Sequence, residues 1–256
     1  MILYSISGPE ERFLNLIGLF YELAVILIAI ILVVLVILKY REKKNKLTLY
    51  LTIIFSLYLL AIVFSWLSKL FVVLKLDLIV DEYSILGIFF YRIASFRISE
   101  FFVGIAIFYS YVLKVNVFQE GYNKIQKILL AIFGAISCFY VLVIYDPGDS
   151  SFSTLLDAIA FLLVFILMAS VYIPFMYRAF ETYRGVQEKE YKTAFLSLAV
   201  MAISFSLIFL NFLIDRLLIL ILDIIGFTPF YYAAWAFGII GILGAYAGYI
   251  RPSREK

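Results

Sequence analysis

Residues 14–38 read LNLIGLFYELAVILIAIILVVLVIL, a run in which Glu22 is the single ionisable side chain apart from Tyr21. A helix needs about 20 apolar residues to cross the hydrocarbon core of a bilayer. The run exceeds that length, and it also exceeds the apolar core of a cleavable signal peptide. The residues before it lack the basic segment that such signals carry. We therefore expect residues 14–38 to form a membrane-spanning helix that is retained as a signal anchor.

Six further apolar stretches of similar length follow. They cover residues 47–73, 85–113, 125–145, 152–177, 193–214, with an alternative end at Leu222, and 230–250. Hydrophobic residues make up 65% of the chain, whereas soluble domains are about half apolar. No polar segment is long enough for a separate soluble domain. The sequence therefore predicts one all-α transmembrane domain over residues 1–256, a polytopic bundle of seven helices.

The basic residues alternate between the loops. Most of the 21 Lys and Arg residues follow the first, third, fifth and seventh stretches: Lys39, Arg41, Lys43, Lys44, Lys46, Lys114, Lys124, Lys127, Arg178, Arg184, Lys189, Lys192, Arg251, Arg254 and Lys256. The opposite loops are mainly acidic, and Arg216 is one of their few basic residues. Because cytoplasmic loops are enriched in Lys and Arg, we expect a multi-pass cell-membrane protein with its N-terminus outside and its C-terminus in the cytoplasm.

The composition excludes several kinds of chemistry. The chain has no histidine and one cysteine, Cys138, which excludes an intrachain disulfide, haem ligation by histidine and zinc sites of the HExxH type. It has no Walker A motif, and residues 230–250 contain no lysine for a retinal Schiff base. We therefore expect no catalytic residue, no metal and no cofactor, and we predict that the protein is not an enzyme.

Ionisable residues inside the apolar stretches are the first candidate site. They are Glu22, Lys69, Arg92, Arg97, Glu100, Asp157 and Asp215, all in the outer or middle part of the membrane under the predicted orientation. Charges in a bilayer pair with one another or face water. The set is therefore either a water-filled vestibule that opens outward or an ion-paired core. Arg97 and Glu100 are three residues apart and can pair. Arg92, Ser95, Ser99, Glu100 and Gly104 are expected to lie on one side of the helix.

A polar stripe on the sixth stretch is the second candidate. Thr193, Ser197, Ser204, Asn211 and Asp215 fall on one face of a helix with 3.6 residues per turn. Such a line of polar side chains can line a path for a solute or polymer. It can equally hold helices together, because Ser and Asn form hydrogen bonds between membrane helices.

The seventh stretch carries small residues at alternating spacings of four and three. These are Ala234, Gly238, Gly241, Ala245 and Gly248. Small residues let two helices approach closely, so the stripe serves packing within the chain or association into an oligomer. On the fifth stretch, Pro174 lies within the span and is expected to kink its helix.

The basic cytoplasmic face allows two interpretations. Positive-inside topology and anionic lipid explain it without further function. Alternatively, the face is a docking surface for a cytoplasmic ATPase or for nucleic acid.

In length, number of spans, absence of histidine and richness in Ile, Leu and Tyr, the whole chain resembles polytopic membrane subunits of thermoacidophilic archaea. Among these it is most similar to the channel subunit of the archaeal Ced-type DNA import system. This resemblance implies a pore subunit that receives single-stranded DNA. It also implies small companion membrane subunits and a separate cytoplasmic ATPase.

These observations predict a non-enzymatic transport subunit of the cell membrane, most specifically one for DNA import, that forms or lines a passage. The residues expected at that passage are Glu22, Arg92, Arg97, Glu100, Asp157, Ser197, Ser204, Asn211 and Asp215. The alternatives are a seven-helix sensor or receptor whose ligand shifts the packing at Pro174, a small-solute transporter, and an assembly scaffold.

Overall fold

A computed structural model describes residues 9–74, 84–118, 123–144, 150–222, 224 and 226–250. The helices in chain order are α1 (Pro9–Lys43), α2 (Lys46–Val73), α3 (Ile85–Ala94), α4 (Arg97–Val117), α5 (Lys124–Val143), α6 (Ser150–Gly185), α7 (Lys189–Leu222) and α8 (Pro229–Ala245), which runs on into a π-helical turn, Tyr246–Ile250. The described residues contain no strand. Seven of these helices are long and apolar enough to cross a membrane, so the predicted all-α, seven-span fold is confirmed.

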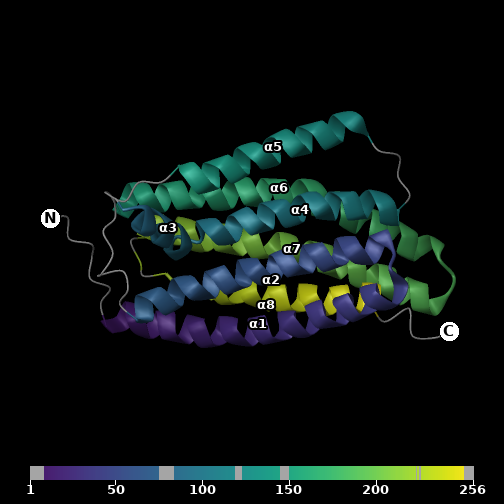
Figure 1. The fold of residues 1–256 in the computed structure, drawn as a ribbon, viewed down its shortest axis with the longest axis horizontal. Helices are drawn as coiled ribbons and strands as arrows, with labels where there is room; N and C mark the ends of the chain where they lie inside the picture. Colours follow the sequence, from purple (N-terminus) through teal and green to yellow (C-terminus); the bar gives the residue numbers. More distant parts are fainter. Residues whose placement is uncertain are drawn as a thin grey trace.

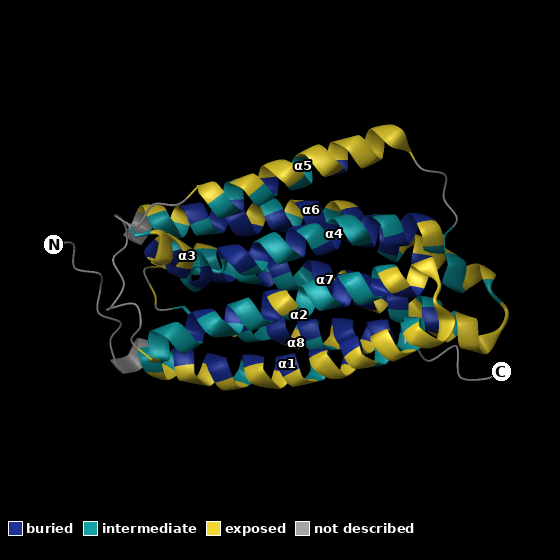
Figure 2. Ribbon diagram, in the orientation of Figure 1, coloured by how far each residue is buried: buried dark blue, intermediate teal, exposed yellow. Residues whose placement is uncertain are grey.

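The long helices lie side by side along the long axis of the molecule (Figure 1). In the bundle, α7 packs against α6 and α8, and α2 packs against α1 and α4. Helix α5 lies at the edge, where it contacts α4 and α6, and most of its surface is exposed (Figure 2). Large apolar side chains such as Phe20, Leu129 and Phe139 are each about three-fifths exposed on the outside of the bundle. In a multi-pass membrane protein these side chains face lipid.

The third apolar stretch is not one helix, and this part of the sequence prediction is wrong. Helix α3 ends at Ala94, α4 begins at Arg97, and Phe96 between them has a φ of 65°. A left-handed backbone costs an L-residue roughly 1–2 kcal/mol. The break places the Phe96 ring beneath two cations, with Lys69 Nζ 4.3 Å and Arg216 Cζ 5.2 Å from its centroid. Such cation–π contacts offset the strain.

Several helices are longer than the predicted spans. Helix α1 covers Pro9–Lys43, and α6 continues through Pro174 to Gly185. Helix α7 ends at Leu222, the longer of the two ends predicted for its stretch. Arg216, expected in a loop, therefore lies within α7. The extension matters for the site, because it brings a cation into the helical bundle.

Helices α7 and α8 approach closely at the glycines of α8. A Cβ atom added to Gly241 would lie 2.4 Å from Phe205 Cε1, and one added to Gly248, in the π-helical turn, would lie 2.4 Å from Leu198 Cδ2. Gly238 faces Ile208 at an ordinary contact distance, and Ala245 is fully buried. These small residues therefore contact a helix of their own chain.

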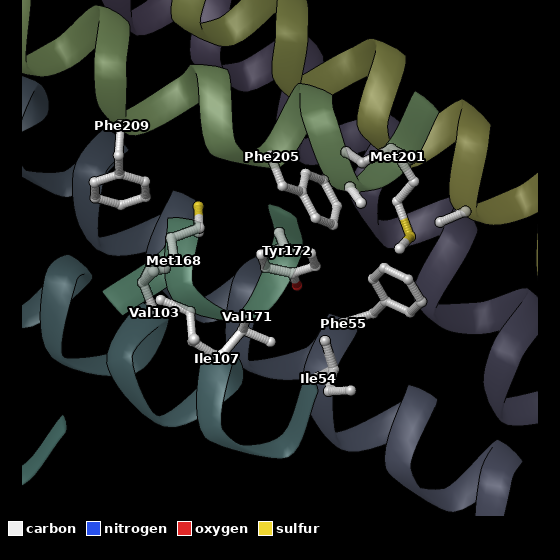
Figure 3. Close-up of a cluster of buried hydrophobic side chains, with 14 of the residues drawn as sticks. Ile54, Phe55, Val103, Ile107, Met168, Val171, Tyr172, Met201, Phe205 and Phe209 are labelled. Carbon is white, nitrogen blue, oxygen red and sulfur yellow. The ribbon is translucent and has the colours of Figure 1, made fainter. Parts of the chain in front are cut away.

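Aromatic and aliphatic side chains fill the centre of the bundle. Figure 3 shows side chains from α2, α4, α6 and α7 that point toward one another: Ile54, Phe55, Val103, Ile107, Met168, Val171, Tyr172, Met201, Phe205 and Phe209. Burial of such side chains supplies most of the free energy that holds helices together in water. In lipid the corresponding contribution comes from close packing.

Candidate functional site

Glu22 and Lys69 form an ion pair between α1 and α2. Lys69 Nζ lies 2.7 Å from Glu22 Oε1, and the two side chains are 1% and 0% exposed. The Glu22 carboxylate also accepts hydrogen bonds from Ser65 Oγ at 3.1 Å and from Tyr231 Oη at 2.7 Å. This pair is buried and fully partnered, so of the two interpretations of the charged set it fits the ion-paired core.

Arg97 pairs across the bundle with Asp157 of α6. Arg97 Nη2 lies 2.8 Å from Asp157 Oδ1, and the side chains are 1% and 14% exposed. The predicted ion pair between Arg97 and Glu100 is not observed. Both residues lie in the first turn of α4, but the Arg97 side chain extends to Asp157 of α6. No hydrogen-bond partner among the described residues reaches the carboxylate oxygens of Glu100.

Asp215 holds the start of α8. Its Oδ1 accepts hydrogen bonds from the Thr228 backbone N–H at 3.0 Å and from the Thr228 hydroxyl at 2.6 Å. Thr228 is the N-cap of α8, and its side chain accepts from Phe230 N. The carboxylate therefore fixes the turn between α7 and α8, which is a structural use of a buried charge.

Arg92 donates hydrogen bonds to backbone carbonyls of two helices. On α3, its Nη1 donates to Ile88 O at 3.0 Å, and its Nε donates to Leu142 O of α5. Because the chain breaks at Phe96, Arg92 and Ser95 do not continue the face of α4 that carries Glu100. The predicted single polar face over residues 92–104 is therefore wrong.

The polar stripe on α7 does not form a line of solvated side chains. Thr193 is exposed and Ser197 is half-buried, whereas Ser204 and Asn211 are buried. The Thr193 hydroxyl and the Asn211 amide donate to the carbonyls of Lys189 and Leu207, in their own helix. Of the stripe, Asp215 alone lines the main cavity described next.

A cavity of about 80 Å³ lies between α1, α2, α4, α6, α7 and α8. Its wall is mainly aliphatic and aromatic, and four of its residues, Phe55, Met168, Phe205 and Phe209, appear in Figure 3. Its polar residues are Tyr58, Ser65, Ser99, Glu100, Asp215, Arg216, Tyr231 and Trp235. The volume is enough for several water molecules or one small organic molecule.

A second, much smaller space lies beside the hydroxyl network at the cytoplasmic end of this cavity under the predicted orientation. Tyr58, Tyr172 and Ser110 are joined by hydroxyl contacts of 2.8 Å. The space next to them, lined by Ser110, Tyr172 and Tyr249 among others, measures about 10 Å³. This is near the minimum for one water molecule.

Sequence reasoning missed the face of α7 that lines the cavity. Phe205, Phe209, Phe212 and Arg216 recur at spacings of four, three and four, which places them on one side of a helix. The spacing was available in the sequence, but aromatic residues at this period are typical of ordinary packing. Their role as a wall depends on the helices around them.

Comparisons with protein-family models, curated proteins and solved structures found no match for this chain.

Proposed function

We propose that this multi-pass membrane protein is a non-enzymatic sensor or receptor that takes a small, largely apolar ligand into the cavity at the centre of its bundle. The observation that carries the proposal is the cavity of about 80 Å³, lined by six helices. Ligand sites in helical bundles are mainly apolar pockets with a few placed polar groups, and this wall has that composition.

The same geometry favours binding over flux. Five of the ionisable residues are held in ion pairs or a helix cap, namely Glu22, Lys69, Arg97, Asp157 and Asp215. On the α7 stripe, Ser204 and Asn211 are buried, and the Thr193 hydroxyl is bonded to its own helix. The small-solute transporter remains the alternative, since a second conformation that opens the bundle would convert binding into transport.

The test is native mass spectrometry of protein purified from its own membranes in mild detergent. We expect a bound small molecule that is lost in Gly238→Leu, because Gly238 lines the cavity and a larger side chain there fills it. Gly134→Leu is the matched control, since a Cβ there meets Leu167 at 3.8 Å, outside the cavity. A ligand that both variants retain, or no ligand in the wild-type protein, would contradict the proposal.

DNA import is a second proposal, which rests on the resemblance to Ced-type channel subunits. It is favoured by exposed basic residues where α1 meets α2 and where α6 meets α7, at the same end of the molecule (Figure 1). These are Arg41, Lys43, Lys44, Lys46, Arg184 and Lys189. A cytoplasmic ATPase or DNA would dock at such a surface. The internal cavity is far smaller than a nucleotide and carries both signs of charge, so the DNA path would form between this chain and companion subunits.

Deletion of the gene tests this second proposal. The DNA-import role predicts that uptake of labelled DNA falls to background in the deletion strain and returns when the gene is restored. Unchanged uptake in the complete deletion strain would remove it, and the receptor proposal would be unaffected.

A further inference from the structure

Glu100 is a buried carboxylate without a partner among the described residues, and it lines the central cavity. Its side chain is 2% exposed, and neither carboxylate oxygen has a hydrogen-bond partner. Burying a charged group without a partner is expensive, and in proteins such groups are normally paired. Glu100 is therefore the one carboxylate of the outer set, within the described residues, whose position is not explained by the packing of the chain itself.

Most other polar groups nearby are engaged elsewhere. Lys69 is paired with Glu22. Arg97 is paired with Asp157 through Nη2, while its Nε and Nη1 have no hydrogen-bond partner among the described residues. The hydroxyls of the two cavity serines donate to other acceptors, Ser65 to Glu22 and Ser99 to the Ala61 carbonyl at 2.8 Å. The backbone N–H of Glu100 donates to Phe96 O. None of the described residues donates a hydrogen bond to the Glu100 carboxylate, so its two oxygens can accept from a ligand in the cavity.

Arg216 is the remaining cation on the cavity wall, and aromatic rings hold it. Its Cζ lies 5.2 Å from the centroid of Phe96 and 5.7 Å from that of Phe161. Both distances are within the range of cation–π attraction. In this arrangement the Arg216 guanidinium lies against the rings of Phe96 and Phe161 and forms no hydrogen bond with the Glu100 carboxylate. The carboxylate can therefore pair with a ligand.

The surroundings of Glu100 suit a positive ligand group. Glu100 lies in the first turn of α4, where the helix dipole favours an anionic side chain. The wall near the polar end of the cavity includes Phe96, Phe212 and Tyr231, whose ring faces attract cations. A metal ion would need several oxygen ligands, whereas an organic ammonium group also gains from the aromatic and aliphatic wall.

We propose that the ligand of this cavity is a small organic molecule with an apolar body and one ammonium group, and that Glu100 is the carboxylate that pairs with that group. This inference rests on the proposed ligand-binding function and specifies its chemistry. The cavity volume of about 80 Å³ limits the ligand to a few carbon atoms unless the bundle expands. Butylammonium is a probe of suitable size, and butanol is its neutral counterpart.

The experiment is calorimetric titration of the full chain in lipid nanodiscs with butylammonium chloride and, separately, with butanol. We expect the wild-type protein to bind butylammonium at least tenfold more tightly than butanol. Glu100→Gln should lose about tenfold or more in affinity for butylammonium and retain its affinity for butanol. Glu42→Gln, at an exposed residue outside the cavity, is the matched control and should change neither.

Several outcomes would overturn the proposal. Equal affinity for the two probes in the wild-type protein would show that no anion faces the ligand, for example because Arg216 pairs with Glu100, and this result does not depend on any variant folding. If a titration with sodium chloride gives the same affinity as butylammonium chloride, and Glu100→Gln weakens both, the site takes a metal ion instead.

The test also separates this inference from the proposed function. If both probes bind equally and Gly238→Leu abolishes both, the cavity is a ligand site without selection for a cation, and the proposed function survives. If neither probe binds and the purified protein carries no ligand, both proposals fail.

Discussion

At the residue scale, the end of the bundle that carries Glu22, Lys69, Arg97 and Asp157 is held by charges that are taken out of water and paired. Glu22 and Lys69 are almost completely buried, and the Glu22 carboxylate has three partners. Breaking such a pair leaves one charge buried and uncompensated, which costs more than the intact pair contributes. An exposed pair is different, because solvent screens both charges.

Lys69→Met should therefore lower the free energy of unfolding by about 3–5 kcal/mol, since the Glu22 carboxylate is left buried without its cation. The double variant Glu22→Gln/Lys69→Met should recover much of that loss, because it leaves no charge behind. The measurement is thermal and chemical unfolding in detergent, analysed as a double-mutant cycle.

The exposed pair Arg178–Glu181, with side chains 47% and 56% exposed, is the control. Arg178→Met should change stability by less than about 1 kcal/mol. An equally small effect for Lys69→Met would mean that water reaches the Glu22 carboxylate, and the outer end would then be a vestibule.

At the element scale, the interface between α7 and α8 depends on glycines that admit a close approach. Gly241 faces the ring of Phe205, and Gly248 faces Leu198. Phe205 is itself buried against Tyr58 and Tyr172, with ring centroids 5.1 Å and 5.7 Å away. The ring therefore has little space into which it can move.

Gly241→Ala should destabilise the protein by about 1–3 kcal/mol, the usual cost of overpacking a tight site, and should disturb the wall of the cavity that Phe205 forms. Gly134→Ala on α5 is the matched control, because its Cβ would meet Leu167 at 3.8 Å. It should be neutral or stabilising by about 0.5–1 kcal/mol, from the higher helix propensity of alanine. Equal melting temperatures for the two variants would contradict the account of the interface.

The sequence is sufficient to predict the elements because a bilayer imposes a length and a composition on each helix. It does not predict the break at Phe96, since no Gly or Pro marks that position and the left-handed conformation depends on Lys69 and Arg216 from other helices. Contacts between helices also decide the partner of Arg97. Its spacing from Glu100 predicts a local pair, whereas the observed partner is Asp157 of α6. Helical periodicity identifies faces, but contacts between helices decide which face lines a cavity.

At the scale of the whole molecule, the orientation in the membrane is still a prediction from the distribution of basic residues. Lys44 lies in the exposed turn between α1 and α2, on the side expected to be cytoplasmic. In a Cys138→Ser background, Lys44→Cys should react with an impermeant thiol reagent only in inside-out vesicles. Labelling from outside intact cells would invert the predicted topology, and every loop would change sides with it.

The central claim for the whole molecule is that its interior holds a ligand-sized cavity and that the α7 stripe is not a water-filled path. The most direct measurement is the rate at which an impermeant, water-soluble methanethiosulfonate reagent modifies single cysteines along α7, added to either side of the membrane in the Cys138→Ser background. Thr193→Cys, at an exposed position, should react, whereas Ser204→Cys and Asn211→Cys, at buried positions, should remain unmodified from both sides. Reaction of Ser204→Cys at a rate close to that of Thr193→Cys would show an aqueous passage and contradict the account.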